Sequence, residues 1–250
     1  MESPGVLRIP DSAPARLVDV RQVRPGRRAV AVGTFDGVHL GHARVVADCG
    51  TVLTFDPHPR SVVRPGGGPR LLTDVAGKRR RLAALGVREV VVIPFDREWA
   101  ALDAATFVDD VLVGRLGAVR VAVGANFRFG ARGGGDAQML RADRRFATTV
   151  AEMVTVGEDV VSSSRIRDLV AAGDVERAAR LLGRPHALPV HALGDDRLVL
   201  DPALAIPRPG RYTAVVDGVA APVTVLGSGV VELARRRAAG PVEVAFLHRS

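Results

Sequence analysis

Short apolar runs that alternate with helical patterns constrain the fold of this chain more than any other feature. The runs at 29–32, 52–55, 90–93 and 119–123 have the length and composition of buried strands. Helical patterns lie between several of them, as in ATFVDDVLVGRLG. This alternation predicts an α/β fold, Rossmann-like and built on a parallel sheet, in which ligands bind at the carboxyl ends of the strands.

The pattern changes after Gly183-Arg184-Pro185. Proline and glycine there separate the β-like runs RYTAVVDG, APVTVLG and PVEVAFL, and the one further element we expect is a turn around 232–239. A chain of 250 residues is long enough for one large domain or two modest ones. We therefore expect an α/β domain over 1–185 and a small, barrel-like β domain over 186–250.

Composition narrows the class of protein. No apolar run reaches the roughly 18 residues that a membrane span needs, and the opening residues MESPGVLRIPDSAP lack the pattern of a signal peptide. A single cysteine, Cys49, excludes internal disulfides and is typical of a reducing compartment. We expect a cytoplasmic protein with no membrane partner.

The net charge of +8 is compatible with nucleic acid, a membrane surface or a small anionic substrate. Only Lys78 among the 35 basic residues is lysine, which indicates the bias of a GC-rich genome. The densest basic run, at 78–81, opens a predicted helix with Thr73 as its N-cap, and we expect it to form a solvated face. Without interleaved aromatic residues it does not predict nucleic-acid binding.

The stretch VGTFDGVHLGH, residues 32–42, allows three interpretations. A metal site at His39 and His42 needs at least three donors, and the chain holds six histidines and one cysteine. The pair could instead fill a turn. The third interpretation is a phosphate cradle, since glycines after a buried strand bring backbone N–H groups close to a ligand and a helix begins near His42. The residues favour this cradle.

GTFDGVHLGH resembles the HxGH motif of nucleotidyltransferases, in the form found in bacterial bifunctional riboflavin kinase/FAD synthetases. Class I aminoacyl-tRNA synthetases share the short core, but a chain with one lysine lacks their lysine-rich KMSKS loop. Four further blocks match that synthetase family in order: TFDPHP (54–59), GANFRFG (124–130), SSSRIR (162–167) and GDVERAARLLGRP (173–185). The resemblance covers roughly 29–185.

The resemblance implies transfer of AMP from ATP to FMN, giving FAD and pyrophosphate. Such a transfer needs in-line positioning and stabilisation of charge rather than a protein nucleophile. It implies Mg²⁺ bound with ATP, no metal ligand from the protein and no nucleic-acid partner, and it predicts no oligomeric state. The catalytic residues that it implies are His39, His42, Ser164 and Arg167. The ATP contacts are Gly33, Phe35, Asp36, Gly37, His39, Gly41, His42, Ser162, Ser163, Ser164 and Arg167. The FMN contacts are Phe55, Pro57, His58, Asn126 and Phe129, with Phe55 equally interpretable as a core strand residue.

Two departures from the family pattern matter. The segment 43–53 is shorter than in the family, so the helix after HxGH should have little more than two turns. The tail lacks the GFPTAN-type block of the kinase module, so we expect a reduced β domain with a structural or substrate-covering role and no riboflavin kinase activity.

The alternatives to FAD synthesis are nucleotidyl transfer to another phosphorylated acceptor and a non-catalytic flavin or nucleotide sensor. A nucleic-acid binder, which would show salt-steep binding, is more distant.

Overall fold

The computed structural model describes residues 14–64, 67–234 and 238–250. The contacts within the chain divide it into two compact units, each assembled from separate stretches of sequence. Unit 1 comprises Met1–Thr34, His42–Gly68 and Arg79–Glu152, and unit 2 comprises Phe35–Gly41, Pro69–Lys78 and Met153–Ser250.

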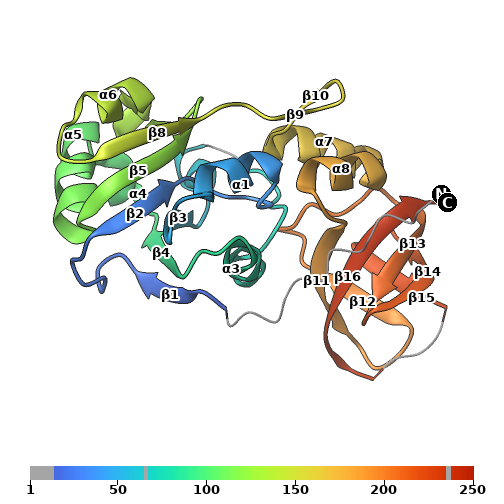
Figure 1. Cartoon of the computed structure of the whole chain (residues 1–250). Helices are drawn as coiled ribbons and strands as arrows, with labels where there is room; N and C mark the ends of the chain where they lie inside the picture. Colours follow the sequence, from blue (N-terminus) through green and yellow to red (C-terminus); the bar gives the residue numbers. More distant parts are fainter. Residues whose placement is uncertain (1–13, 65–66, 235–237) are drawn as a thin grey trace. The chain divides into compact units, whose positions relative to one another are not determined.

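Unit 1 is built on a six-stranded sheet whose neighbouring strands are all parallel, in the order β1-β4-β3-β2-β5-β8 (Figure 1). The strands are β1 (Arg16–Asp19), β2 (Arg28–Val32), β3 (Thr51–Asp56), β4 (Glu89–Pro94), β5 (Ala118–Gly124) and β8 (Ala147–Ala151). The four predicted runs are confirmed as β2 to β5. Strands β1 and β8 were not predicted, because edge strands keep polar, half-exposed positions and give no continuous apolar run.

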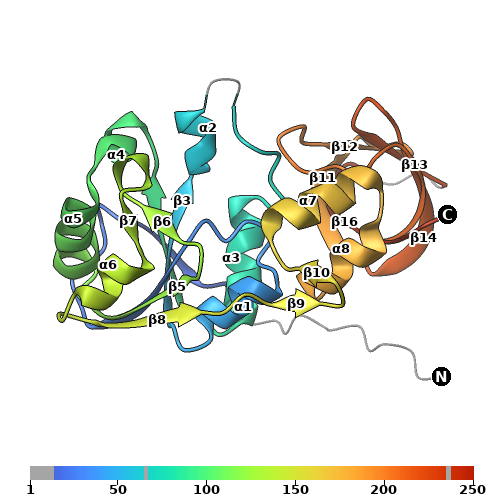
Figure 2. The same ribbon diagram turned by 90° about the horizontal axis from the view of Figure 1, so that it is seen from above.

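Helices lie on both sides of this sheet, with α5 and α6 on one side and α1 and α3 on the other (Figure 2). The predicted helix within 105–117 is confirmed, since α5 continues directly into a π-helical segment, η1. Four apolar side chains of η1, beginning with Phe107 and Val108, are buried against the valines of the central strands. The helices are α1 (Leu40–Val46), α2 (Pro59–Val63), α3 (Val75–Ala84), α4 (Arg97–Ala101), α5 (Ala104–Thr106), η1 (Phe107–Arg115) and α6 (Ala137–Ala142). Short elements between β5 and α6 are β6 (Arg128–Phe129), η2 (Ala131–Gly133) and β7 (Gly135–Asp136).

Two expectations about α3 are wrong. Its N-terminal bond is made by Asp74, whose carboxylate accepts from the Gly77 amide at 2.8 Å, while the Thr73 hydroxyl donates to the Asp74 carbonyl. The basic run is not simply a solvated face, since Lys78 and Arg81 are only 8% and 7% exposed. Burial of Lys78 is compensated by the carboxylate of Asp36, with which it interacts electrostatically.

Unit 2 contains a closed antiparallel barrel with the strand order β11-β12-β15-β14-β13-β16. Its interior is filled by side chains such as Leu188, Tyr212 and Phe246, all fully buried. The expected turn around 232–239 is wrong at its start, because Glu232 lies in β15; residues 235–237 fall outside the described part. The strands are β11 (His186–Ala192), β12 (Arg197–Leu200), β13 (Gly210–Val216), β14 (Val219–Val225), β15 (Val230–Leu233) and β16 (Gly240–Arg249).

Two helices of unit 2, α7 (Ser163–Ala172) and α8 (Val175–Leu182), pack against each other, and α8 also packs against β11 and β16 (Figure 2). A small hairpin of β9 (Thr155–Val156) and β10 (Asp159–Val160) precedes them. Side chains at Ser162 and Asp174 cap the two helices, and each helix ends at a glycine in the left-handed conformation.

Candidate functional site

The loop Phe35–Gly41, called here the 35–41 loop, has an unusual backbone. Phe35, Gly37 and Val38 have φ values of 48°, 83° and 44°. Glycine adopts such values freely, and a Cβ on Gly37 would lie 2.8 Å from Leu72 Cδ1. For an aromatic and a β-branched residue the left-handed conformation costs about 1–3 kcal/mol each, so other contacts must hold the loop in this shape.

Groups from three other segments of unit 2, two side chains and one backbone amide, supply those contacts. The Ser163 hydroxyl donates to the Asp36 carbonyl at 2.9 Å, and the Leu72 amide donates to the Asp36 carboxylate at 2.8 Å. The Arg184 guanidinium donates to the carbonyls of Gly37 and Val38. The structure therefore brings the 35–41 loop and the start of α7 together within unit 2.

Asp36 is 2% exposed, and its carboxylate contacts protein groups inside unit 2. Its Oδ2 atom lies 3.5 Å from Nε of Arg167. Burial raises the pKa of Asp36 above its ordinary value, while Arg167, the Leu72 amide and Lys78 act in the opposite direction. The carboxylate that the resemblance assigns to ATP is thus engaged with protein groups, and it orients Arg167.

His39 is 6% exposed, and its ring packs against Gly41, where an added Cβ would lie 3.2 Å from the imidazole. Burial, followed by the positive charges of Arg184 and Arg167, lowers the pKa of His39 to about 4. At neutral pH the imidazole is uncharged, with one N–H donor and one acceptor nitrogen. A buried histidine that is neutral because of burial and two arginine charges can donate a hydrogen bond to an anion while it stays uncharged.

His42 follows three residues later, half-buried in α1, and its contacts place it in unit 1. The helix spans seven residues, which confirms the predicted length of about two turns. Gly33, also in unit 1, donates its backbone N–H to the Leu53 carbonyl at 3.1 Å. That N–H group therefore extends the sheet.

The three serines at the start of α7 differ in their surroundings. Ser162 caps the helix by accepting from the Arg165 amide at 3.2 Å, and Ser163 binds the 35–41 loop. Ser164 is exposed on the first turn. Of the three hydroxyls, that of Ser164 is the best placed to meet a ligand. Arg167 lies on the same helix, and its side chain is 17% exposed.

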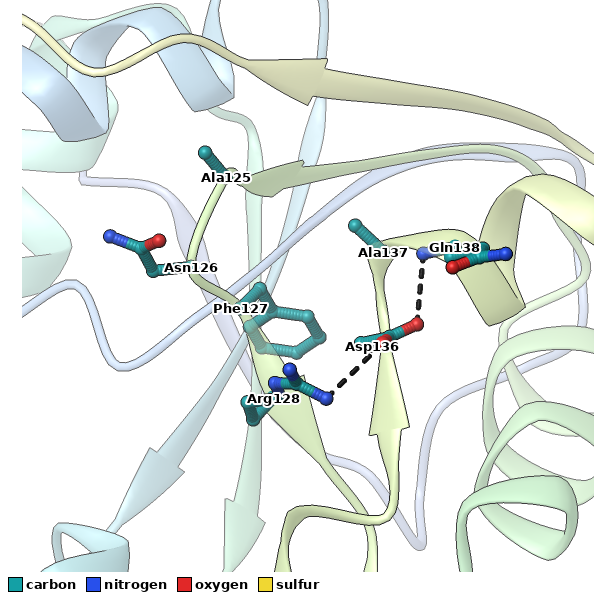
Figure 3. Close-up of a pocket in the computed structure, with 7 residues that line it drawn as sticks. All are labelled: Ala125, Asn126, Phe127, Arg128, Asp136, Ala137 and Gln138. Atoms are coloured by element: carbon teal, nitrogen blue, oxygen red, sulfur yellow. Dashed lines mark hydrogen bonds and ion pairs between the residues drawn. The ribbon is translucent and has the colours of Figure 1, made fainter.

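The residues assigned to FMN by resemblance lie in unit 1, where a pocket of about 330 Å³ opens between β5 and α6 (Figure 3). Asn126 lines it. Arg128 and Asp136 form an ion pair of 3.1 Å at the pocket, and Asp136 also caps α6 through the Gln138 amide at 2.9 Å. The full lining is Ala125, Asn126, Phe127, Arg128, Asp136, Ala137 and Gln138.

The other four predicted FMN residues are not in this lining. Phe129 is buried in the core and stacks on Phe127 with ring centroids 5.6 Å apart. Phe55 packs edge to face on Phe95, and His58 caps α2 by accepting from the Arg60 amide at 3.2 Å. Pro57 is exposed at the end of β3.

The sequence did not predict several residues that contribute to the 35–41 loop or to the pocket of unit 1. Arg184 lay inside a matched block but carried no sequence signal that its guanidinium binds backbone carbonyls. Leu72 contributes through its backbone amide, which no side-chain pattern reveals. Phe127 and Arg128 lie between the two residues selected in GANFRFG, and Gln138 follows the glycine-rich stretch 130–136.

Among the described residues, no group of three histidine, cysteine or acidic side chains could hold a metal ion. In the part of the chain that the structure describes, no helix has the length and apolar character to cross a membrane.

Comparisons with known proteins place these observations in a family. The model of the family "FAD synthetase" matches residues 22–165. The bifunctional riboflavin kinase/FMN adenylyltransferase of Listeria monocytogenes is 35% identical over 172 residues, covering 64% of this chain and 54% of that protein. The Escherichia coli K12 protein of the same name is 33% identical over 216 residues, covering 80% of this chain and 68% of its own length.

The match spans only about half of the Listeria protein. A solved structure, described as a macrolide-efflux protein from Streptococcus pneumoniae, superposes with a TM-score of 0.79, covers 94% of this chain and 90% of its own, and is 22% identical. At that identity it shows a shared fold alone. The family model, in contrast, covers more than half of the 250 residues. This chain belongs to the FAD synthetase family.

Proposed function

We propose that this chain is an FMN adenylyltransferase, which transfers AMP from ATP to FMN and releases FAD and pyrophosphate. Membership of the FAD synthetase family supports the reaction class. The observation that carries the proposal is the arrangement in unit 2, where the buried Asp36 carboxylate orients Arg167 and a neutral His39 lies in the same loop.

In the proposed reaction an FMN phosphate oxygen attacks the α-phosphorus of ATP. A bond forms between them as the bond from the α-phosphorus to the oxygen bridging to the β-phosphate breaks, and pyrophosphate leaves. No protein nucleophile takes part. The protein must hold the phosphates in line and stabilise negative charge as it moves to the leaving group.

Each residue of the site has a distinct proposed task. Neutral His39 donates one hydrogen bond to a phosphate oxygen, and His42 donates a second from the following helix. Arg167 offers its two Nη groups to the β- and γ-phosphates, because its Nε faces Asp36. The exposed hydroxyl of Ser164 adds a neutral donor, and Ser163 keeps the loop in place.

Mg²⁺ is part of the proposal as an ion that arrives with ATP. Magnesium retains water and is usually bound through substrate phosphates with one or two carboxylates. Asp36 is engaged by Arg167 and the Leu72 amide, so it does not suit that task. The ion would partly neutralise the triphosphate, and the protein residues above supply the remaining contacts.

We assign FMN to the five residues Phe55, Pro57, His58, Asn126 and Phe129. Asn126 is the strongest of them, because its exposed amide lines the pocket of unit 1 beside Phe127 (Figure 3). Phe129 and Phe55 contribute indirectly in this proposal, because Phe129 packs on Phe127 and Phe55 packs on Phe95. An amide that both donates and accepts hydrogen bonds suits the polar edge of a flavin ring.

We further propose that residues 1–185 form the adenylyltransferase domain and that 186–250 form a reduced β domain without riboflavin kinase activity. The β domain has a structural role in this proposal. Its residues Ala203 and Ala205 exchange backbone hydrogen bonds with Leu71, at 2.8 and 2.7 Å, next to the Leu72 amide that binds Asp36. A cytoplasmic location is included on the ground of the single cysteine.

The test is direct. The purified chain is incubated with ATP, Mg²⁺ and FMN, and FAD and pyrophosphate are measured by chromatography and a coupled pyrophosphate assay. We expect equimolar formation of both products. Binding of ATP and FMN without any FAD would contradict adenylyl transfer and support a non-catalytic sensor. ATP consumption with a phosphorylated acceptor other than FMN would support the alternative transferase.

A further inference from the structure

Arg184, two residues beyond the end of α8, binds the backbone of the 35–41 loop. Its Nη1 group donates to the Val38 carbonyl at 2.9 Å and to the Leu182 carbonyl at 3.2 Å, and its Nη2 group donates to the Gly37 carbonyl. One guanidinium therefore fixes two successive carbonyls of the loop and the end of its own helix.

These carbonyls belong to the strained part of the loop. Gly37 and Val38 both have positive φ, and Val38 is β-branched, so this conformation is intrinsically unfavourable for it. The directions of the two carbonyl groups define the turn that leads into His39. A planar guanidinium with donors in a fixed fork holds both directions at once, which a lysine ammonium does not reproduce.

Arg184 is itself held firmly. Its backbone amide donates to the Ala179 carbonyl at 3.1 Å, and β11 begins two residues later at His186. The preceding Gly183 has φ 75°, and a Cβ there would lie 2.8 Å from Leu40 Cδ2. The end of α8 thus touches the 35–41 loop twice, through the Arg184 side chain and through Leu40 on Gly183.

We propose that Arg184 is a positioning residue for adenylyl transfer, which holds the 35–41 loop in the shape that presents His39 to the ATP phosphates. This inference rests on the proposed function. It gives Arg184 a task separate from that of Arg167, because Arg184 binds protein carbonyls whereas Arg167 faces the substrate.

The charge of Arg184 has a second effect on the same histidine. After burial, Arg184 is the largest influence that lowers the pKa of His39, ahead of Arg167 on α7. The negative charge of Asp36, the acidic group of the loop, interacts with the positive charges of Arg167 and Lys78. Removal of the Arg184 charge should therefore raise the pKa of His39 from about 4 toward its ordinary value of 6.5, although burial and Arg167 still oppose protonation.

Two substitutions separate geometry from charge. Arg184→Lys keeps the positive charge and loses the fork, whereas Arg184→Gln loses the charge and keeps an amide donor. The matched controls are Arg180→Lys and Arg180→Gln, since Arg180 is exposed on the same helix. We measure kcat and KM for ATP in FAD formation and backbone amide hydrogen exchange across 35–41. The His39 resonance, assigned with a His39→Gln variant, is followed by NMR titration.

We expect Arg184→Lys to lower kcat by at least about tenfold, because small displacements of a positioned group cost one to two orders of magnitude. It should also accelerate amide exchange in the loop and leave the His39 pKa low. Arg184→Gln should do the same to kcat and exchange, and raise the His39 pKa. Both Arg180 variants should match the unaltered chain in every measurement.

Equal kcat and equal exchange in Arg184→Lys and Arg180→Lys would overturn the proposal. So would complete unfolding of Arg184→Lys, because it would assign Arg184 to the fold rather than to the loop. If the unaltered chain makes no FAD, the proposed function fails by itself. The exchange and titration measurements then decide the role of Arg184 without turnover: unchanged exchange refutes it, and faster exchange confined to 35–41 supports it.

Discussion

The Nε atom of Arg167 donates to the Oδ2 atom of the buried Asp36 carboxylate at 3.5 Å. Asp36 is held in turn by the Leu72 amide at 2.8 Å. Among the described residues, the Nη groups of Arg167 donate to no other protein atom in the structure. The ion pair therefore fixes the Nε edge of the guanidinium and leaves its two Nη groups available for a ligand. This arrangement suits bidentate binding of phosphate.

Arg167→Lys should lower kcat/KM for ATP by roughly 10²-fold, because an ammonium cannot bind Asp36 and two phosphate oxygens in one plane. The matched control is Arg80→Lys, at an exposed position of the basic run on α3, which should change kcat/KM by less than about twofold. Steady-state kinetics of FAD formation measures both. Similar losses in the two variants would mean that overall positive charge, and not a defined arginine, attracts ATP.

His42→Ala should lower kcat by roughly 10²-fold or more, the scale for loss of one preorganised donor to developing charge. The thermal midpoint should change little, since His42 is half-buried on a short helix and outside the main core of unit 1. Single-turnover assays and thermal unfolding are measured side by side. A His42→Ala variant with a much lower thermal midpoint, but with normal turnover at temperatures where it is folded, would show that His42 has a structural role.

The central strands were predictable from sequence, because strands buried on both faces need continuous apolar residues, as in Val90 to Ile93. The edge strands β1 and β8 carry no such signal. The cap of α3 fell on Asp74 rather than Thr73, since both residue types cap helices and only the fold selects between them. The local sequence pattern therefore predicts whether a segment is a helix or a strand better than it predicts the residues at which that element begins and ends.

The candidate site was predictable in part. Glycine spacing around His39 pointed to a tight loop, and the positive φ of Gly37 agrees with it. The neutral state of His39 depends on burial and on Arg184, which is distant in sequence, so no local pattern reveals it. The burial of Lys78 likewise follows from the nearby charge of Asp36 and not from the basic run itself.

The stability of the protein should fall as pH decreases from about 6.5 to about 4 because of His39. In this window the unfolded chain binds a proton on His39 that the folded chain excludes, so acid favours unfolding. The full difference between a pKa of 6.5 and one of about 4 corresponds to roughly 3 kcal/mol of unfolding free energy. Urea unfolding at several pH values in this window measures it.

The matched comparison for this pH dependence uses His39→Gln, which should reduce the slope of unfolding free energy against pH. Identical slopes in His39→Gln and in the unaltered chain would show that His39 is protonated equally in the folded and unfolded states.

His186→Phe should weaken the link between the barrel and Asp36. The buried His186 donates from Nε2 to the Ala205 carbonyl at 2.8 Å, and the Ala205 amide donates to the Leu71 carbonyl at 2.7 Å. Phenylalanine keeps a ring next to Phe246 but leaves the Ala205 carbonyl without this donor, at a cost of about 1–3 kcal/mol. We expect lower stability and a higher KM for ATP.

The control for His186→Phe is His191→Phe, which places the same side chain on the exposed face of the same strand. Urea unfolding and ATP titration compare the two variants. Loss of stability in His186→Phe with an unchanged KM would restrict the barrel to a folding role and remove its proposed connection to the phosphate site.

The last prediction is that this chain does not phosphorylate riboflavin. Phosphoryl transfer needs a cradle for the ATP phosphates, groups that help hold the metal, and a base for the attacking hydroxyl. Residues 186–250 contain no asparagine and two threonines, Thr213 and Thr224, both within strands of the barrel. Glu232, exposed on β15 directly opposite Thr224, is an available base, but a base alone contributes about 10²–10⁴-fold. Incubation with riboflavin, ATP and Mg²⁺ should therefore give no FMN above the enzyme-free rate, measured by fluorescence-detected chromatography. FMN formation that disappears in Glu232→Gln and persists in Glu243→Gln, a control at an exposed position on strand β16 of the same barrel, would establish a kinase site on the barrel and refute the reduced-domain proposal.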